Sequence, residues 1–439
     1  MVPPAILGPE CSGGAAASGG IDYPRRVAVP RALRPAADAA IRPVRTLWLL
    51  SGAHAINHAQ AALLPLVYLK VIDELHVSVA AIAFLTAVGS LAAGLVQLAY
   101  GWLTRIASRR SVLVTGGLLF GGGMAAQALA TGFPSFAAAN VLSRVGGSPQ
   151  HPVGNALLAE QFPPQRRGFA ISAHIAGGNL GTIAIPLIGA WLIAGVGWRW
   201  TVVLFGAPAI LVALAILALV QETGADRAAA RAHGSVRDAF RVILHDRDLL
   251  WLYAASMIAA GGRGLGVINL FVPLYLNRIL HLGTTAVAIM YTVLLLGSVP
   301  GPLVAGWLSD RIGRRPVIVG AYGCGAAAMV LFVLAGSNPW LLWLAIVGLS
   351  VFVYVESPQL QAILADLAPV SVRDVAFSTY FTLAFGVGSL WAALFGVFIA
   401  ATGEDTGLPL VFWMMAGSFV GAALAVLPIR TAQRASARA

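Results

Sequence analysis

Three ionisable residues lie deep inside apolar stretches of this sequence. They are Glu356, Arg144 and Arg263, each well within an apolar run of about 20 residues or more. An ionised side chain in hydrocarbon costs about 2.5–3.5 kcal/mol on insertion scales unless it is paired or hydrated. We therefore expect Glu356 to share a polar space with one of the two arginines. Either Glu356 accepts a proton while an arginine binds an anion, or the pair is a permanent salt bridge that only organises the helices.

Four histidines also fall in apolar stretches of the first half of the chain. They are His54, His58, His151 and His174. His54 and His58 share a helix face, and with Asn57 and Gln60 they make that face polar. Because histidine changes charge near neutral pH, His58 and His151 are candidates for carrying a proton, although a hydrogen-bonded structural role explains each equally well. No carboxylate or thiol accompanies them at ligand spacing, so we expect no metal site.

The composition places these residues in a membrane protein. The chain has 439 residues, of which 59% are apolar and only 10% are charged, and its mean hydropathy is +0.83. Soluble domains carry about 25% charged residues, so an ordinary soluble domain is excluded. Cys11 and Cys324 are the two cysteines, and their placement offers neither a disulfide framework nor a thiol metal site.

Twelve apolar segments are long enough to cross a hydrocarbon core of about 30 Å. We predict spans at 46–72, 78–103, 111–131, 134–161, 168–195, 200–220, 249–276, 283–307, 316–336, 339–366, 375–401 and 408–429. The pattern predicts an all-α membrane protein of two six-helix bundles. Its parts are a disordered tail (1–45), a first bundle (46–220), a linker (221–248), a second bundle (249–429) and a tail (430–439).

The basic residues predict the orientation of the chain. Arginines gather in the two tails, the linker and alternate connections, whereas only Lys70, Arg199 and Arg278 lie in the other connections. The positive-inside rule therefore places both termini in the cytoplasm, in a multi-pass protein of the cytoplasmic (inner) membrane. The net charge of +11 faces anionic lipid on this view. We expect the lipid bilayer as a partner, no nucleic acid, no cofactor and a monomeric chain.

A charged turn occurs in both halves of the chain. Residues 306–315 read GWLSDRIGRR, and residues 101–110, which lie 205 positions earlier (306 − 101), read GWLTRIASRR. The residues that we assign to these turns are Gly306, Asp310, Arg311, Gly313, Arg314 and Arg315 in the second half, and Gly101, Arg109 and Arg110 in the first. By a similar offset of 206, Gln150 corresponds to Glu356 and Glu160 to Asp366. The chain is therefore an internal duplication with polar residues at equal depth.

The turn at 306–315 resembles the loop signature of the major facilitator superfamily, where it lies between helices 8 and 9. Gly197-Trp198-Arg199-Trp200 before the sixth span is similar to that family as well. The resemblance implies two pseudo-symmetric six-helix bundles around a central cavity that works by alternating access.

A narrower set of motifs resembles the fosmidomycin-resistance efflux branch of that family. It consists of Gln150-His151-Pro152, Gly177-Gly178-Asn179-x-Gly181 with Pro186, Gly52-x-His54, Gln97 before Gly101, and Arg263. The branch usually has an Asn-Asp pair where this chain has Asn57-His58. This resemblance adds Asn57, Gln150 and Asn179 to the candidates for substrate binding or coupling. The glycines serve either close helix packing or a rocking contact.

The family resemblance suggests a role for the charged turns. We expect Asp310 to accept a hydrogen bond from Arg311 or Arg314 and to face the start of the eleventh span near Val375. Either that contact holds the two halves together in one conformational state, or the arginines only set the membrane topology. In the first half Arg105 replaces the acid, so we expect no equivalent carboxylate contact there.

The function predicted from the sequence is secondary active transport. We expect proton-coupled efflux of a small organic compound, anionic because the cavity has a surplus of positive charge, or of an antimicrobial. The alternative is a proton-coupled uptake symporter for an organic acid or a sugar-like metabolite. An enzyme is not expected, because the sequence has no soluble domain or nucleotide motif. A membrane sensor would need an output domain larger than the linker.

Overall fold

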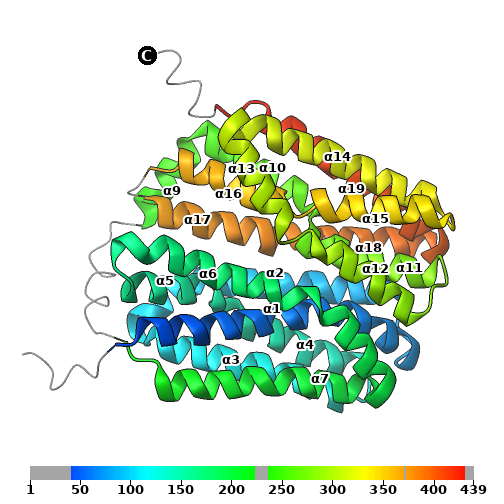
Figure 1. Cartoon of the computed structure of the whole chain (residues 1–439), viewed down its shortest axis with the longest axis horizontal. Helices are drawn as coiled ribbons and strands as arrows, with labels where there is room; N and C mark the ends of the chain where they lie inside the picture. The colour runs from blue at the N-terminus through cyan, green and yellow to red at the C-terminus, as the bar shows by residue number, and fades with distance from the viewer. Residues whose placement is uncertain (1–40, 223–235, 370–371, 431–439) are drawn as a thin grey trace, which may run out of the picture. The chain divides into compact units, whose positions relative to one another are not determined.

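The computed structural model describes residues 41–222, 236–369 and 372–430, and these residues are helical with short connections (Figure 1). The predicted tails, apart from residues 41–45 and Arg430, and residues 223–235 of the predicted linker lie outside the described residues. Figure 1 shows the helices of the first half (blue to green) on one side and those of the second half (yellow-green to red) on the other, with their long axes running in the same direction.

Seven helices and two short turns make up the described first half. They are α1 (Pro43–Glu74), α2 (Val79–Ile106), α3 (Arg109–Ala126), η2 (Gln127–Leu129), α4 (Phe133–Gly147), η3 (Ser148–Gln150), α5 (Pro152–Gln161), α6 (Pro164–Ile183) and α7 (Ile185–Leu219). Gly197 has φ +78° inside α7 and separates the fifth crossing from the sixth. A side chain rarely adopts that conformation, so glycine suits this position.

The described second half has more and shorter helices. They are α9 (Val236–His245), α10 (Arg247–Ala259), η4 (Ala260–Gly262), η5 (Gly264–Ile268), α11 (Asn269–Arg278), α12 (Thr284–Leu296), α13 (Pro300–Ile312), α14 (Arg314–Ala335), α15 (Pro339–Phe352), α16 (Glu356–Leu367), α17 (Arg373–Phe381), η7 (Thr382–Gly386), η8 (Val387–Ser389), α18 (Leu390–Thr402) and α19 (Glu404–Val426). The six crossings of this half are α10–α11, α12–α13, α14, α15–α16, α17–α18 and α19.

The crossings agree with the predicted all-α membrane fold. Ten stretches of the described residues are long and apolar enough, by length and composition, to cross a membrane. One of them, Leu180–Leu219, contains the break at Gly197 and so serves two crossings. The remaining crossing is α4–η3–α5. The twelve predicted spans therefore all coincide with helical crossings.

Several crossings break near their middle, which the sequence analysis did not predict. In the described chain the breaks lie at 148–151, 260–268, 297–299, 353–355 and 382–389. Freed backbone groups inside a membrane need other partners. The amide of Gly264 donates to the carbonyl of Val353 (3.1 Å), and that of Gly297 donates to Ser350 Oγ (2.9 Å). The break at 260–268 thus donates to the break at 353–355, and the break at 297–299 donates to the crossing that contains Ser350.

Several polar and charged side chains lie inside the bundles, and many large apolar side chains are exposed on the outside. Arg263, Glu356 and His54 are buried, whereas Trp191, Trp340 and many leucines are exposed. This arrangement is the reverse of that expected in water. It fits a protein whose outer surface contacts lipid and whose interior holds a polar pathway.

Candidate functional site

A cavity of about 310 Å³ lies between the two halves. Its walls come from α1, α2 and α4 in the first half, and from the breaks after α10 and α17 in the second. Its polar lining side chains include Asn57, Gln60, Tyr68, Ser90, Arg144, His151, Arg263, Asn269 and Ser389. This volume is at the lower end of the range of small-molecule sites, about 300–1,000 Å³. The cavity therefore suits a compact organic ligand.

Arg144 projects into the cavity from α4 and is held by neutral groups. Its Nε donates to Asn140 Oδ1 (3.0 Å), its Nη1 to Ser90 Oγ (3.2 Å) and its Nη2 to the hydroxyl of Tyr68 (3.0 Å). Gly89 leaves room for it, because a Cβ there would lie 2.4 Å from Arg144 Cδ. Among the described residues, no acidic group forms a salt bridge with Arg144. Its positive charge is therefore held in place but not neutralised.

Arg263 lies at the break of the seventh crossing and pairs with Glu356, where α16 begins. The Arg263 Nε donates to Glu356 Oε1, and the side chains are 4% and 1% exposed. The guanidinium also donates to the carbonyl oxygens of Ala384 and Ser256, and its Cζ lies 4.7 Å from the ring centroid of Phe385. Of the two arginines expected as partners for Glu356, the structure places Arg263 there. Arg263 lines the cavity and Glu356 lies behind it.

The three ionisable residues together give the cavity a positive charge. Glu356 neutralises Arg263, which leaves Arg144 unbalanced within the described part of the chain. A cation in a low-dielectric cavity attracts an anion more strongly than the same cation does in water. The arrangement can therefore bind an anionic group at Arg144, and a guanidinium favours a carboxylate or phosphate.

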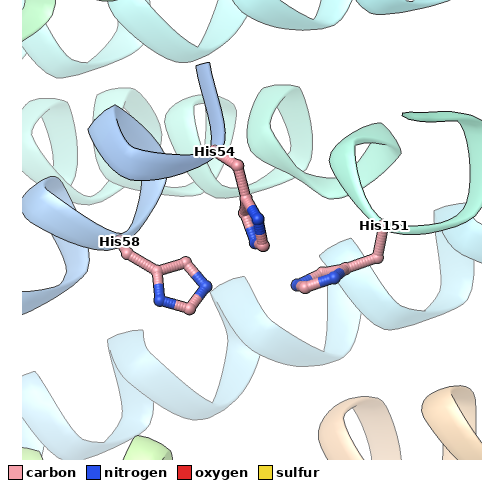
Figure 2. A group of neighbouring side chains, drawn as sticks. All are labelled: His54, His58 and His151. Carbon is pink, nitrogen blue, oxygen red and sulfur yellow. The ribbon is translucent and has the colours of Figure 1, made fainter. Parts of the chain in front are cut away.

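The four histidines predicted in the first half form one cluster beside the cavity. The ring centroid of His54 lies 4.5 Å from that of His58, 4.6 Å from that of His151 and 4.5 Å from that of His174. Figure 2 shows His54 and His58 on α1 and His151 at the start of α5, with the three rings turned toward one another. His151 lines the cavity, and His58 is half-buried. His58 and His151 were candidates from the sequence, whereas the meeting of all four histidines was not predicted.

The three predicted amide residues lie in different places. Asn57 lines the cavity, and its Nδ2 donates to the carbonyl of Gly147 (3.1 Å). Gln150 is buried in η3 and faces a small space among α1, α3 and α7. The side chain of Asn179 lies outside the described residues. Of the three, the structure therefore brings only Asn57 to the cavity.

The glycines that precede and follow Asn179 pack α6, which belongs to the fifth crossing, against α1. A Cβ at Gly178 would lie 2.7 Å from the ring of His54, and one at Gly181 would lie 2.2 Å from the carbonyl oxygen of Ala55. These contacts join α6 to α1 within the first half. They agree with close helix packing, one of the two expected roles.

The charged turn of the second half is centred on Arg314. This side chain pairs with Asp310 (2.9 Å) and with Asp366 (3.4 Å), and it also donates to Ser309 (2.8 Å). Arg311 lies instead over the ring of Trp307, with its Cζ 3.6 Å from the centroid. These contacts connect the turn to α16 in the same half. The expected contact with the start of the eleventh crossing is not among those of the described residues.

The charged turn of the first half has carboxylate partners that the sequence did not predict, and they lie within the same half. Arg109 pairs with Glu160 (2.5 Å), and the backbone amides of Arg109 and Arg110 donate to Glu222 (3.0 and 3.1 Å). Arg105 does replace the acid within the turn, but Glu160 supplies the charge from the end of α5. Glu160 is the repeat counterpart of Asp366, so both halves hold their turn in the same way. The surroundings of Gly101 lie outside the described residues.

A second set of charged contacts lies at the opposite end of the bundle, where α1 ends, and the sequence analysis missed it. Arg278 donates to Asp73 (2.6 Å), which joins the two halves. The amide of Val79 donates to Glu404 across the halves (3.3 Å). Within the first half, Glu74 accepts from Trp198 (2.6 Å) and Arg199 (2.7 Å). The signal available in the sequence was the presence of opposite charges at equivalent helix ends.

Comparison with known proteins agrees with the fold described above. Residues 50–275 and 255–439 match the Major Facilitator Superfamily. The cis,cis-muconate transport protein of Acinetobacter baylyi is 27% identical over 354 residues, which cover 76% of this chain and 81% of that protein. The citrate-proton symporter of Salmonella typhi is 26% identical over 294 residues, covering 62% and 65%.

A solved structure shows the same fold. The crystal structure of a D-xylose-proton symporter superposes with a TM-score of 0.72 at 15% identity, covering 87% of this chain and 97% of that one. The relatives named above give no support to the narrower resemblance to the fosmidomycin-resistance branch.

Proposed function

The chain belongs to the Major Facilitator Superfamily, and on this premise we propose that it is a proton-coupled symporter that takes up a small organic carboxylate by alternating access. It is a membrane transport protein and not an enzyme. The observation that carries the proposal is Arg144, a cavity arginine held by neutral partners without an acidic one among the described residues.

Arg144 suits a carboxylate ligand for geometric and electrostatic reasons. A guanidinium offers paired donors that match the two oxygens of a carboxylate. Tyr68, Ser90 and Asn140 fix its orientation before the ligand arrives, which lowers the entropy lost on binding. Arg263 is less suited, because Glu356 already neutralises its charge.

We assign the coupling proton to Glu356. Its Oε1 accepts from Arg263, and its Oε2 is buried without a hydrogen-bond partner in the part of the chain that the structure describes. A proton on this carboxyl would weaken the pair and free the guanidinium of Arg263, which lines the cavity. The alternative is a permanent pair that only holds the breaks of the seventh and tenth crossings together.

The names of the relatives support uptake of an organic acid in preference to efflux. Two relatives are named for a muconate and for citrate, both of which are carboxylates, and the second is named a proton symporter. Efflux, which the sequence analysis favoured, rested on the branch resemblance that these relatives do not support. We therefore place the uptake symporter first and efflux second.

We place the protein in the cytoplasmic membrane with both termini inside and as a monomer. The arginine-rich tails, linker and charged turns support this orientation. In this orientation the pair Asp73–Arg278 lies at the outer end and joins the halves. The ion pairs of the charged turns each lie within one half. The conformation described here is thus consistent with closure on the outside.

The proposal is tested by transport into proteoliposomes with an imposed pH gradient. Labelled muconate and citrate are compared with a neutral sugar, for wild type, Arg144→Gln and Arg144→Lys. The matched control is Arg237→Gln, an exposed arginine on α9. We expect carboxylates to accumulate in the direction of proton flow, with Arg144→Gln lowering apparent affinity about 10- to 100-fold, as loss of a charged hydrogen bond implies.

Three results would count against it. Substrate movement opposite to the protons would favour efflux. Equal transport of carboxylates by Arg144→Gln and wild type would remove the assigned anion site. Transport of the sugar alone would overturn the carboxylate class.

A further inference from the structure

Three imidazoles, two on α1 and one directly before α5, face a common point beside the cavity, and we propose that they bind one divalent transition-metal ion. The residues are His54, His58 and His151, and the ion is Zn²⁺ or a neighbour such as Co²⁺ or Ni²⁺. No metal site was expected from the sequence, because no carboxylate or thiol accompanies the histidines at ligand spacing. The fold brings the three together (Figure 2).

The spacing of the ring nitrogens is close to that of a metal site. One ligand nitrogen from each residue lies within 4.8 Å of the other two. Two nitrogens bound to one tetrahedral zinc ion are about 3.4 Å apart, because each Zn–N bond is about 2.1 Å long. His54 and His58 are one helical turn apart on the same face. Binding one ion therefore requires the three side chains to rotate so that their nitrogens approach one another.

The hydrogen bonding of His54 prepares it to be a ligand. Its Nδ1 lies 2.9 Å from the carbonyl oxygen of His174. A carbonyl oxygen only accepts, so Nδ1 carries the hydrogen and, in the neutral ring, Nε2 keeps its lone pair. That Nε2 is buried and has no hydrogen-bond partner among the residues placed by the structure. Histidine ligands commonly donate their other N–H to a backbone carbonyl in this way.

The packing around His54 holds its ring in this position. A Cβ at Gly178 would lie 2.7 Å from the ring, so glycine there allows close contact. The ring of His174, which lies on the same helix as Gly178, stacks on that of His54 with an interplanar angle of 25° and a centroid distance of 4.5 Å. His54 is therefore oriented by its neighbours before any ion binds.

The ligand set indicates the class of ion. Imidazole nitrogens suit zinc, nickel and copper, whereas Mg²⁺ and Ca²⁺ prefer oxygen ligands. Three imidazoles leave one tetrahedral position for water or another ligand. His151 also stacks on Phe381 of the second half, with centroids 6.1 Å apart and planes 14° apart. An ion that fixes His151 would therefore stabilise this contact between the halves.

The direct test is metal binding to the purified full-length protein, prepared with an affinity tag that lacks histidine and stripped with a chelator. Titration with ZnCl₂ should saturate at one ion per chain, and MgCl₂ should not bind. With CoCl₂ we expect the visible absorption of a four-coordinate site with nitrogen ligands. X-ray absorption of the zinc form should show imidazole nitrogens at about 2.0–2.1 Å.

Variants identify the ligands. His58→Gln and His151→Asn should each weaken zinc binding at least about 10-fold, the lower limit seen even for residues that only support a ligand. The control His245→Gln, an exposed histidine on α9, should bind like wild type. Removing the thiols by Cys11→Ser and Cys324→Ser should also leave binding unchanged.

The proposal fails if zinc does not bind, if His58→Gln and His151→Asn bind as tightly as wild type, or if absorption shows sulfur or only oxygen ligands. If a variant does not fold, the X-ray absorption of wild type decides, because it needs no substitution. None of these readouts depends on transport, so they stand apart from the test of the symporter.

Discussion

The guanidinium of Arg278, at the end of α11, donates to the carboxylate of Asp73, at the end of α1, over 2.6 Å. The two residues are 205 positions apart, the same offset as between the charged turns, so they occupy equivalent positions in the two halves. Equivalent positions of a pseudo-two-fold repeat meet only near its axis. This pair therefore marks where the halves touch at the end opposite the charged turns.

Breaking this pair should shift the conformational equilibrium modestly. The side chains are 25% and 57% exposed, and exposed pairs contribute about 0.2–1 kcal/mol. We expect Asp73→Asn to favour opening at this end by at most about 5-fold, read from the reactivity of a cysteine placed in the cavity. The charge swap Asp73→Arg with Arg278→Asp should restore the wild-type value, and the exposed control Asp405→Asn should not change it. Failure of the swap to restore it would argue against the pair.

Breaking the buried pair Arg263–Glu356 should lower stability much more than breaking the exposed pair Asp73–Arg278. Glu356→Gln leaves the guanidinium of Arg263 without its counter-charge at 4% exposure. Removing one partner of such a pair costs about 3–5 kcal/mol. We expect a clear fall in the thermal unfolding temperature of the purified protein and loss of transport. The matched control is Glu74→Gln, which breaks a partly exposed pair with Arg199 and should cost at most about 1 kcal/mol.

Replacing both buried partners separates stability from function. Arg263→Met with Glu356→Leu removes both charges, and apolar replacements of a buried pair are often neutral for stability. We expect the double variant to unfold near the wild-type temperature and to transport nothing. Transport by this variant would show that the pair is only structural.

The fold could be predicted from the sequence because span length and internal repetition are both visible in it. Hydrocarbon thickness sets the length of each span, and the repeat of the charged turn at residues 101–110 and 306–315 reveals the duplication. The breaks within the crossings were not predictable from hydropathy. They depend on contacts between crossings, such as Gly264 to Val353, which join residues far apart in the chain.

The candidate site was predictable only in part, because its geometry also depends on contacts between crossings. Buried charge identified Arg144, Arg263 and Glu356, because ionisable residues at that depth need a partner or water. The choice of Arg263 as the partner of Glu356 depends on a helix break that the sequence does not reveal. Likewise, the meeting of His151 with His54 depends on how α5 packs beside α1, and this cannot be read from spacing.

The two halves make a close contact beside the cavity at Gly94 and Gly386, and a side chain larger than that of glycine should disturb it. A Cβ at Gly94 on α2 would lie 2.4 Å from the Cα of Gly386 in η7, which is backbone and cannot rotate away. Overpacking costs about 1–3 kcal/mol, enough to shift the balance between conformers by about 5- to 150-fold. We expect Gly94→Val to slow transport strongly while the protein remains folded, as judged by gel filtration. The control Gly122→Ala meets open space and should transport like wild type.

The charged turns should act through Arg314 and its counterpart Arg109. Arg314 is shared between Asp310, whose side chain is 68% exposed, and Asp366. Asp310→Asn removes one of the two carboxylates that pair with Arg314 and leaves the contact with Asp366. We therefore expect lower transport with normal membrane insertion. Asp310→Asn combined with Asp366→Asn should lower transport further, because Arg314 then loses both carboxylates.

In the first half, Glu160→Gln should reproduce part of this loss, since Glu160 holds Arg109 as Asp366 holds Arg314. Initial transport rates, normalised to the protein inserted, measure these effects. Wild-type rates in the Asp310→Asn variant and in the double variant would mean that the turns only set topology.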